Sequence, residues 1–216
     1  CRKRARFLFS VPCDREKMTT KATNMDVVFG FLSVIRSAED GLFGGYLILN
    51  GQGRPLEFHC TAPVKANRAQ EILYGATLEP FLHGEQIGQT LMSAAKRVPQ
   101  VVCTDVLPVL ALQSVTSTPV VWVADRLPAT RMTAVEPGDL RKLVDEADCS
   151  RLSTFSAVYP FAFADHVLLM HESMRDQQDD ICQQLTPLLQ LIELHEPFAR
   201  IQAAIEEAHR NALGES

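Results

Sequence analysis

Several familiar sequence features are missing from this chain of 216 residues. It contains neither of the glycine-rich loops, GxGxxG and GxxxxGK followed by Ser or Thr, that hold the phosphates of a nucleotide. No GxSxG motif is present to expose a serine nucleophile. Every apolar run is far shorter than the roughly 20 residues that cross a bilayer. These absences argue against the familiar nucleotide-binding loops, a hydrolase of the GxSxG type and a membrane partner.

The six cysteines are widely spread and form no CxxC pair. The apolar run at residues 7–9 is too short for the hydrophobic region of a secretory signal. Spread cysteines in a chain without such a signal are typical of free thiols in a reducing compartment. The sequence therefore predicts a cytoplasmic protein with no disulfides.

The net charge of −5 is unevenly distributed. Residues 1–24 carry seven basic and two acidic side chains, which gives +5 and leaves about −10 for the rest of the chain. An acidic body repels phosphate backbones, so the sequence does not favour a nucleic-acid partner. Residues 1–24 are interpreted as a basic arm, either a disordered tail or a segment foreign to the natural product. Residues 25–148 then form an α/β core, and residues 149–216 a C-terminal region of strand and helix.

The pattern of apolar residues predicts a mixed α/β fold. Turn residues Asn50–Gly53 separate two β-rich runs and predict an antiparallel hairpin. Asn67 and Gln70 have the spacing of a capping box, which marks the start of a helix. A strand, a short helix and a strand within residues 100–124 predict a parallel pair. The expected strands cover residues 27–35, 45–49, 55–61, 100–104, 119–124 and 167–170, and the expected helices residues 85–98, 105–115 and 137–147.

From Met174 onward the spacing of apolar residues is helical. Pro197 is expected to begin the last helix, whose apolar stripe contains Phe198, Ile201 and Ile205. Such a stripe must be buried against another surface. It packs either on the sheet of the same chain or on a partner, so a homodimer or a protein partner through these C-terminal helices is predicted as possible.

His59 and Cys60 are adjacent, as a nucleophile and its base would be. Neighbouring residues of a strand point to opposite faces, so these two side chains do not serve each other. Cys60 shares its face with Leu56 and Phe58 and is predicted to be a core residue. No histidines or cysteines have the spacing of a familiar metal site, so neither a metal nor another cofactor is predicted.

Residues 61–68 lead from a strand into the capped helix. Free N–H groups at a helix start favour an anion, and two cations lie nearby. Lys65, Asn67 and Arg68 are therefore candidate anion-binding residues. The alternative is a solvated loop whose cations pair with Glu57 or Glu71.

Two functions remain open. The absence of an assembled nucleophile, base and oxyanion group favours a non-catalytic interaction or adaptor module, or one that senses a small ligand. The alternative is an enzyme acting on a small anionic substrate at Lys65 and Arg68, with His59 or Asp105 as the acid–base group. The two are separated by whether His59, Asp105 and the two cations converge on one pocket.

Overall fold

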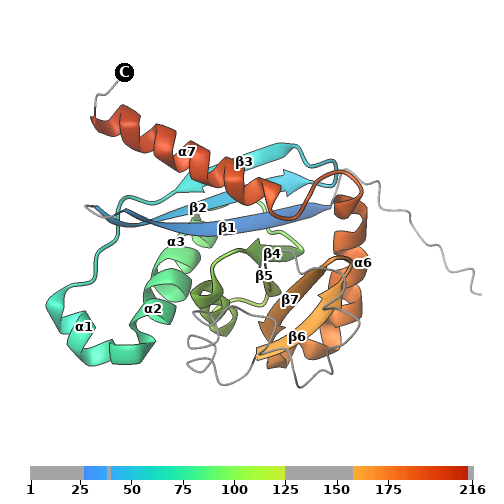
Figure 1. The fold of residues 1–216 in the computed structure, drawn as a ribbon, viewed down its shortest axis with the longest axis horizontal. Coiled ribbons are helices and arrows are strands. Elements are labelled where there is room, and N and C mark those ends of the chain that lie inside the picture. The colour runs from blue at the N-terminus through green and yellow to red at the C-terminus, as the bar shows by residue number, and fades with distance from the viewer. Residues whose placement is uncertain (1–26, 38–39, 125–157, 214–216) are drawn as a thin grey trace, which may run out of the picture.

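The computed structural model describes residues 27–37, 40–124 and 158–213. Seven strands form one mixed sheet in the order β3-β2-β1-β4-β5-β7-β6 (Figure 1). The fold is therefore mixed α/β, as predicted. The strands are β1 (Val28–Ser37), β2 (Gly41–Asn50), β3 (Pro55–Cys60), β4 (Val101–Thr104), β5 (Val120–Val123), β6 (Val158–Phe163) and β7 (His166–His171).

The pairing of the strands follows the predicted pattern over the first half of the chain. β1, β2 and β3 are antiparallel neighbours, and Asn50 turns the chain by accepting the N–H groups of Gln52 and Arg54 at its side-chain oxygen. β4 lies parallel to both β1 and β5, which confirms the predicted parallel pair. The hairpin of β6 and β7 then joins β5 in the antiparallel direction.

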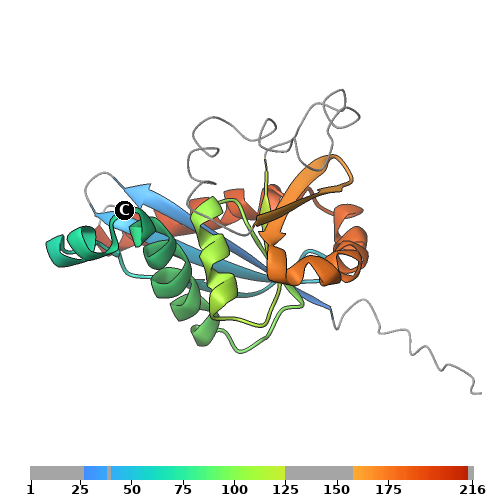
Figure 2. The same ribbon diagram turned by 90° about the horizontal axis from the view of Figure 1, so that it is seen from below.

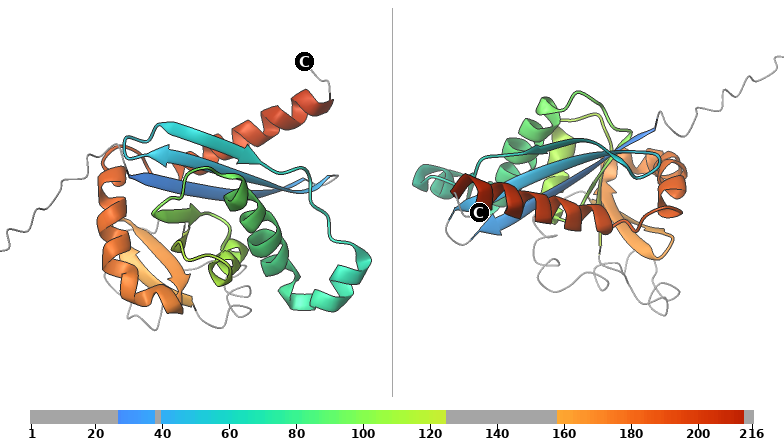
Figure 3. Two further views of the ribbon diagram at one scale, coloured as in Figure 1. Left: turned by 180° about the vertical axis from the view of Figure 1, so that it is seen from behind. Right: turned by 90° about the horizontal axis from the view of Figure 1, so that it is seen from above.

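Helices cover both faces of the sheet (Figures 2 and 3). Gly44 and Gly45 of β2 point to opposite faces, because a Cβ on Gly44 would lie 2.2 Å from Ile87 and one on Gly45 2.4 Å from Ile201. The first face carries α2 (Leu78–Pro80), the π-helix η2 (Phe81–Gly88), α3 (Gln89–Ala94) and the 3₁₀ helix η3 (Leu107–Ser114). The second carries the 3₁₀ helix η5 (Glu172–Gln177), α6 (Gln178–Leu189) and α7 (Glu196–Leu213).

The apolar stripe of α7 packs on the sheet of its own chain. Phe198 makes an edge-on ring contact with Phe31 at 5.5 Å between centroids, and Ile201 and Ile205 are buried against β2. Because the sheet of the same chain covers this stripe, the stripe is not available to a second chain. The predicted homodimer or partner contact through the C-terminal helices is corrected accordingly.

Two predicted helices differ in detail from the structure. The helix expected at 85–98 ends at Ala94, and it follows a wide π-helical turn that already begins at Phe81. Gly84 permits this turn, because a Cβ there would lie 2.7 Å from the backbone nitrogen of Leu112 in η3. The helix expected at 105–115 is a 3₁₀ helix, and the one expected at 137–147 lies outside the described residues.

β7 and α7 fall where a strand and a final helix are predicted. In the described part of the chain, no helix has both the length and the apolar character to cross a membrane. The division into an arm, a core and a C-terminal region stays a prediction.

Candidate functional site

β3 is one of the two edge strands of the sheet, and its burial is the reverse of what its sequence predicts. Leu56 and Phe58 are 36% and 38% exposed, and Cys60 is exposed as well. The polar Glu57, in contrast, has a side chain only 14% exposed. The alternation of faces is as predicted, but Cys60 is not a core residue, because α7 covers β1 and β2 and leaves this side of β3 open.

The edge of the sheet continues beyond β3 as an irregular segment. The Thr61 N–H donates to the Gly44 carbonyl at 2.9 Å, and the Gly44 N–H donates to the Thr61 hydroxyl at 3.0 Å. Val64 and Leu42 then exchange backbone hydrogen bonds of 2.8 and 2.9 Å. These bonds hold residues 61–64 beside β2 and extend the edge toward α1 (Arg68–Tyr74).

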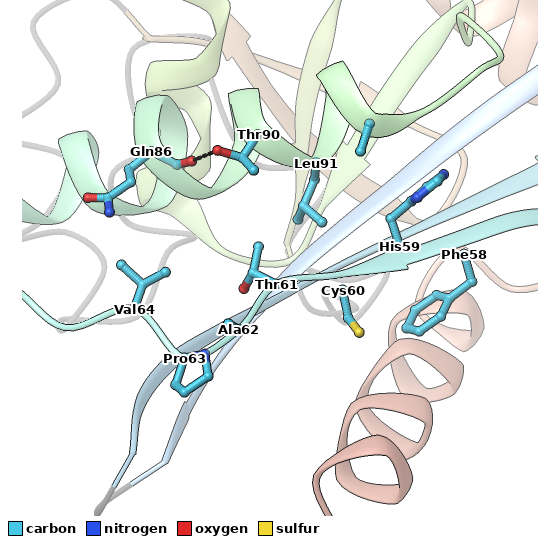
Figure 4. Close-up of a pocket in the computed structure, with 11 residues that line it drawn as sticks. Phe58, His59, Cys60, Thr61, Ala62, Pro63, Val64, Gln86, Thr90 and Leu91 are labelled. Carbon is cyan, nitrogen blue, oxygen red and sulfur yellow. Dashed lines mark hydrogen bonds between the residues drawn. The ribbon is translucent and has the colours of Figure 1, made fainter. Parts of the chain in front are cut away.

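An open groove of about 590 Å³ follows this edge (Figure 4). Its far wall is formed by the helical residues Gln86, Thr90, Leu91 and Ala94. In Figure 4, Phe58 and Cys60 lie on the side of β3 that faces α7, and His59 points the other way. No carboxylate is among the lining residues, which are Phe58, His59, Cys60, Thr61, Ala62, Pro63, Val64, Gln86, Thr90, Leu91 and Ala94.

Glu57 gathers polar groups at the β3 end of the groove. Its Oε2 accepts the backbone N–H of Lys96 at 2.9 Å and lies 3.1 Å from Nε2 of His59. Its Oε1 lies 3.6 Å from Nε of Arg97. The hydrogen bond from the Lys96 backbone, followed by the one from His59, lowers the pKa of Glu57 below its ordinary value. Glu57 is therefore ionised at neutral pH.

His59 and Asp105 do not converge. The cross-strand neighbours His59, Tyr46, Leu32 and Thr104 form one row over the four strands from β3 to β4. Three strand spacings of about 4.8 Å separate the ends of this row by roughly 14 Å. Between them, Tyr46 is fully buried, and burial raises the pKa of its phenol, so it stays neutral. Asp105, which follows Thr104, is not among the residues that line the groove.

The predicted anion-binding residues lie beyond the other end of the groove. The capping box is confirmed, because the Asn67 side chain accepts the Gln70 N–H at 2.8 Å and the Gln70 side chain accepts the Asn67 N–H at 3.0 Å. Arg68 donates to Glu71 at 2.9 Å, the pairing expected of a solvated loop. Lys65 directly follows Val64, which lines the groove. None of the three residues lines the groove, and anion binding by them stays a prediction.

Within the described ranges, no group of three or more His, Cys, Asp or Glu side chains could hold a metal ion. The cysteines described there, Cys60, Cys103 and Cys182, are free thiols. Burial raises the pKa of the Cys103 thiol to about 12, whereas Cys60 lies at the groove surface. Of the described thiols, Cys60 is the one that a ligand in the groove would meet.

Sequence reasoning missed Lys96 and Arg97, and it considered Glu57 only as a partner of the cations near residues 65 and 68. Glu57 could have been found, because residues two apart on a strand share a face and it therefore lies beside His59. Lys96 and Arg97 could not, because 39 residues separate Lys96 from the carboxylate that its N–H contacts.

No family model and no curated protein matches the chain. Its fold is similar to that of solved enzymes named endonuclease V. For the catalytic domain of human endonuclease V the TM-score is 0.47 at 14% identity, covering 88% of this chain and 85% of that one. For *Ciona intestinalis* endonuclease V in complex with a 23mer DNA containing an inosine, the TM-score is 0.39 at 13% identity, covering 73% and 76%. *Marinitoga piezophila* Argonaute with guide RNA and target DNA matches at a TM-score of 0.33 and 9% identity, covering 80% of this chain and 27% of that one.

These similarities contradict the predicted function. The similar structures are nucleic-acid-cleaving enzymes and a nucleic-acid complex, which are not interaction or adaptor modules and not enzymes for a small anionic substrate. The prediction against a nucleic-acid partner is likewise corrected, because the similar structures include complexes with DNA and RNA. That prediction was drawn from net charge, which does not report the local charges of a chain. At these low identities and TM-scores, the similarities assign no activity to this chain.

Proposed function

We propose that this chain binds single-stranded nucleic acid along the groove beside β3. The observation that carries the proposal is the absence of carboxylates from the groove lining, in a chain of net charge −5, together with cationic side chains at both ends. Binding of a phosphate backbone depends on such local charge.

The cations come from segments far apart in the sequence. Lys96 and Arg97 lie at the His59 end, where Glu57 contacts both residues, and both side chains are exposed. Lys65 follows the last lining residue at the opposite end. The edge from Glu57 to Val64 spans roughly 23 Å at about 3.3 Å per residue. A strand lying along it would therefore have several phosphates within reach of cations.

The groove also offers surfaces for bases. Both Phe58 and His59 line the groove, but from opposite sides of β3: the 38% exposed Phe58 lies on the side that faces α7. Exposed rings stack on bases of any sequence and contribute about 1–3 kcal/mol for each base. The hydroxyls of Thr61 and Thr90 and the amide of Gln86 add polar groups between the ends. Such a site binds strands with little sequence preference.

The test is fluorescence anisotropy of the full chain with labelled strands of about 12 nucleotides, between about 50 and 200 mM salt. The affinities for RNA and DNA strands are compared to test whether the sugar matters. A duplex of the same length tests whether single strands are preferred. We expect single strands to bind more tightly than the duplex. Failure of every strand to bind at the lowest salt would overturn the proposal.

The decisive variant carries Lys96→Ala with Arg97→Ala. Each lost phosphate contact lowers the slope of log affinity against log salt by about 0.7, so the pair should lower it by about 1.4. The matched control removes two exposed cations elsewhere, Arg175 and Arg210, each paired with a carboxylate one turn earlier. Equal loss of affinity in both variants would indicate general attraction to a charged surface and contradict a site at the groove.

A cytoplasmic location belongs to the same proposal. The free thiols of Cys60, Cys103 and Cys182 are consistent with a reducing compartment.

A further inference from the structure

Glu57 holds the β3 end of the groove together. Its carboxylate contacts His59 on its own strand and Lys96 and Arg97 from the segment between α3 and β4. Its side chain is 14% exposed, whereas those of His59 and Arg97 are 26% and 54% exposed. The shielded carboxylate of Glu57 therefore lies between two more exposed side chains: His59, which lines the groove, and Arg97, at its end.

The contact with Glu57 also decides which nitrogen of His59 a ligand meets. An ionised carboxylate only accepts hydrogen bonds, so Nε2 of His59 must carry the proton that it shares with Oε2 of Glu57. In the neutral imidazole, Nδ1 then has no proton and accepts. When the ring is protonated, Nδ1 becomes a donor, which is what a phosphate oxygen requires.

The charged and titratable groups around His59 come from its own strand, from β2 and from the segment after α3. Glu57 is ionised, Arg97 is positively charged, and Tyr46, the neighbour on β2, is a buried neutral phenol. The side chain of Lys96 is exposed, and the α3 residues that line the groove, Thr90, Leu91 and Ala94, do not titrate.

We infer that Glu57 is a positioning residue of the groove: it fixes the Nε2–H form of His59, so that His59 contacts a phosphate only when protonated, and it holds Lys96 and Arg97 at the end of the groove. This inference rests on the proposed function. The inference adds that the affinity for a nucleic-acid strand rises as the pH falls. The reason is that protonated His59 can donate a charge-assisted hydrogen bond to the phosphate backbone.

The test compares the affinity of the full chain for a single strand at about pH 6 and about pH 8, at constant salt. The parent should bind about tenfold more tightly at the lower pH. Glu57→Gln keeps the size of the side chain, but its amide can donate or accept, so it no longer fixes the imidazole. In that variant the neutral ring can also carry its proton on Nδ1 and donate it to a phosphate, so most of the pH dependence should be lost. Glu71→Gln, which removes an exposed carboxylate paired with Arg68, should behave like the parent.

Two further measurements separate this inference from the proposed function. The amide proton of Lys96, observed by NMR without nucleic acid, should move upfield in Glu57→Gln, because a neutral acceptor replaces the carboxylate. His59→Gln, which leaves Glu57 in place, should bind with the same affinity at both pH values. If the parent binds strands but Glu57→Gln or His59→Gln keeps the parental pH profile, the inference is overturned and the groove proposal stands. If the parent binds no strand, the groove proposal fails, whatever the Lys96 amide shows.

Discussion

β2 and β3 are neighbouring strands of one hairpin, yet helices cover them to different extents. β2 has helices packed on both of its faces, with Ile87 against Gly44 and Ile201 against Gly45. β3 pairs with β2 along one side only, and its apolar Leu56 and Phe58 are partly exposed. The difference teaches that alternation gives the two faces of a strand, whereas the position of the strand in the sheet decides which face is covered. The edge position also leaves the groove open.

The largest effects, of similar size, are expected from two changes of volume on β2, and the first of them adds volume. In Gly45→Val, the new Cβ would lie 2.4 Å from Cγ2 of Ile201 and 2.8 Å from Cδ1 of Ile205, so α7 must move. Overpacking of this kind costs about 3 kcal/mol. Cys60, the cross-strand neighbour of Gly45, is exposed, so Cys60→Val should change the free energy of unfolding by less than about 0.5 kcal/mol. Urea unfolding measures both, and equal losses would contradict the comparison.

The second of these changes removes volume. Leu47 is 4% exposed, and its cross-strand neighbour Phe58 is 38% exposed. Leu47→Ala should cost about 2–5 kcal/mol because it leaves a cavity. Phe58→Ala should cost less than about 1 kcal/mol, because water already reaches the ring. A larger loss from Phe58→Ala than from Leu47→Ala, measured by denaturant unfolding, would show that the face of β3 beside α7 is covered.

A smaller effect, dependent on pH, is expected at Glu57. Because folding lowers the pKa of this carboxyl, its stabilisation is fully present above the ordinary pKa of a glutamate. It is lost as the pH falls through the lowered value, where the folded protein also takes up the proton. Thermal melting of the parent and of Glu57→Gln should therefore differ at neutral pH and converge in acid. A difference that grows toward acid pH would contradict this sign.

The last comparison measures how readily a reagent reaches two thiols in the folded protein, and it does not concern stability. Cys60 lies at the groove, whereas Cys103 is fully buried on β4 with its thiol pKa raised to about 12. Iodoacetamide should therefore modify Cys60 in the folded protein and Cys103 only after unfolding, as peptide mass spectrometry would show. Modification of Cys103 at the rate of Cys60 would indicate that the core opens readily.

Local patterns gave most of the fold. The turn at Asn50, the capping box at Asn67 and the parallel strands around residues 101 and 120 are decided by neighbouring residues, and each is confirmed. The π-helix at Phe81–Gly88 was not predictable, because it depends on how closely Gly84 approaches Leu112. The site was the least predictable part. His59 was a candidate from its residue type, but the approach of Arg97 to Glu57 depends on how α3 returns the chain to the sheet.

The placement of α7 has a consequence for the order of events during synthesis. Phe31 on β1 is covered by Phe198, which leaves the ribosome only after every strand of the sheet has been made. Until then, α6 is the helix available to cover this face, and the part over β1 and β2 lacks α7. Exposed apolar surface on a nascent chain promotes aggregation. Strand pairing therefore precedes closure of this layer by α7.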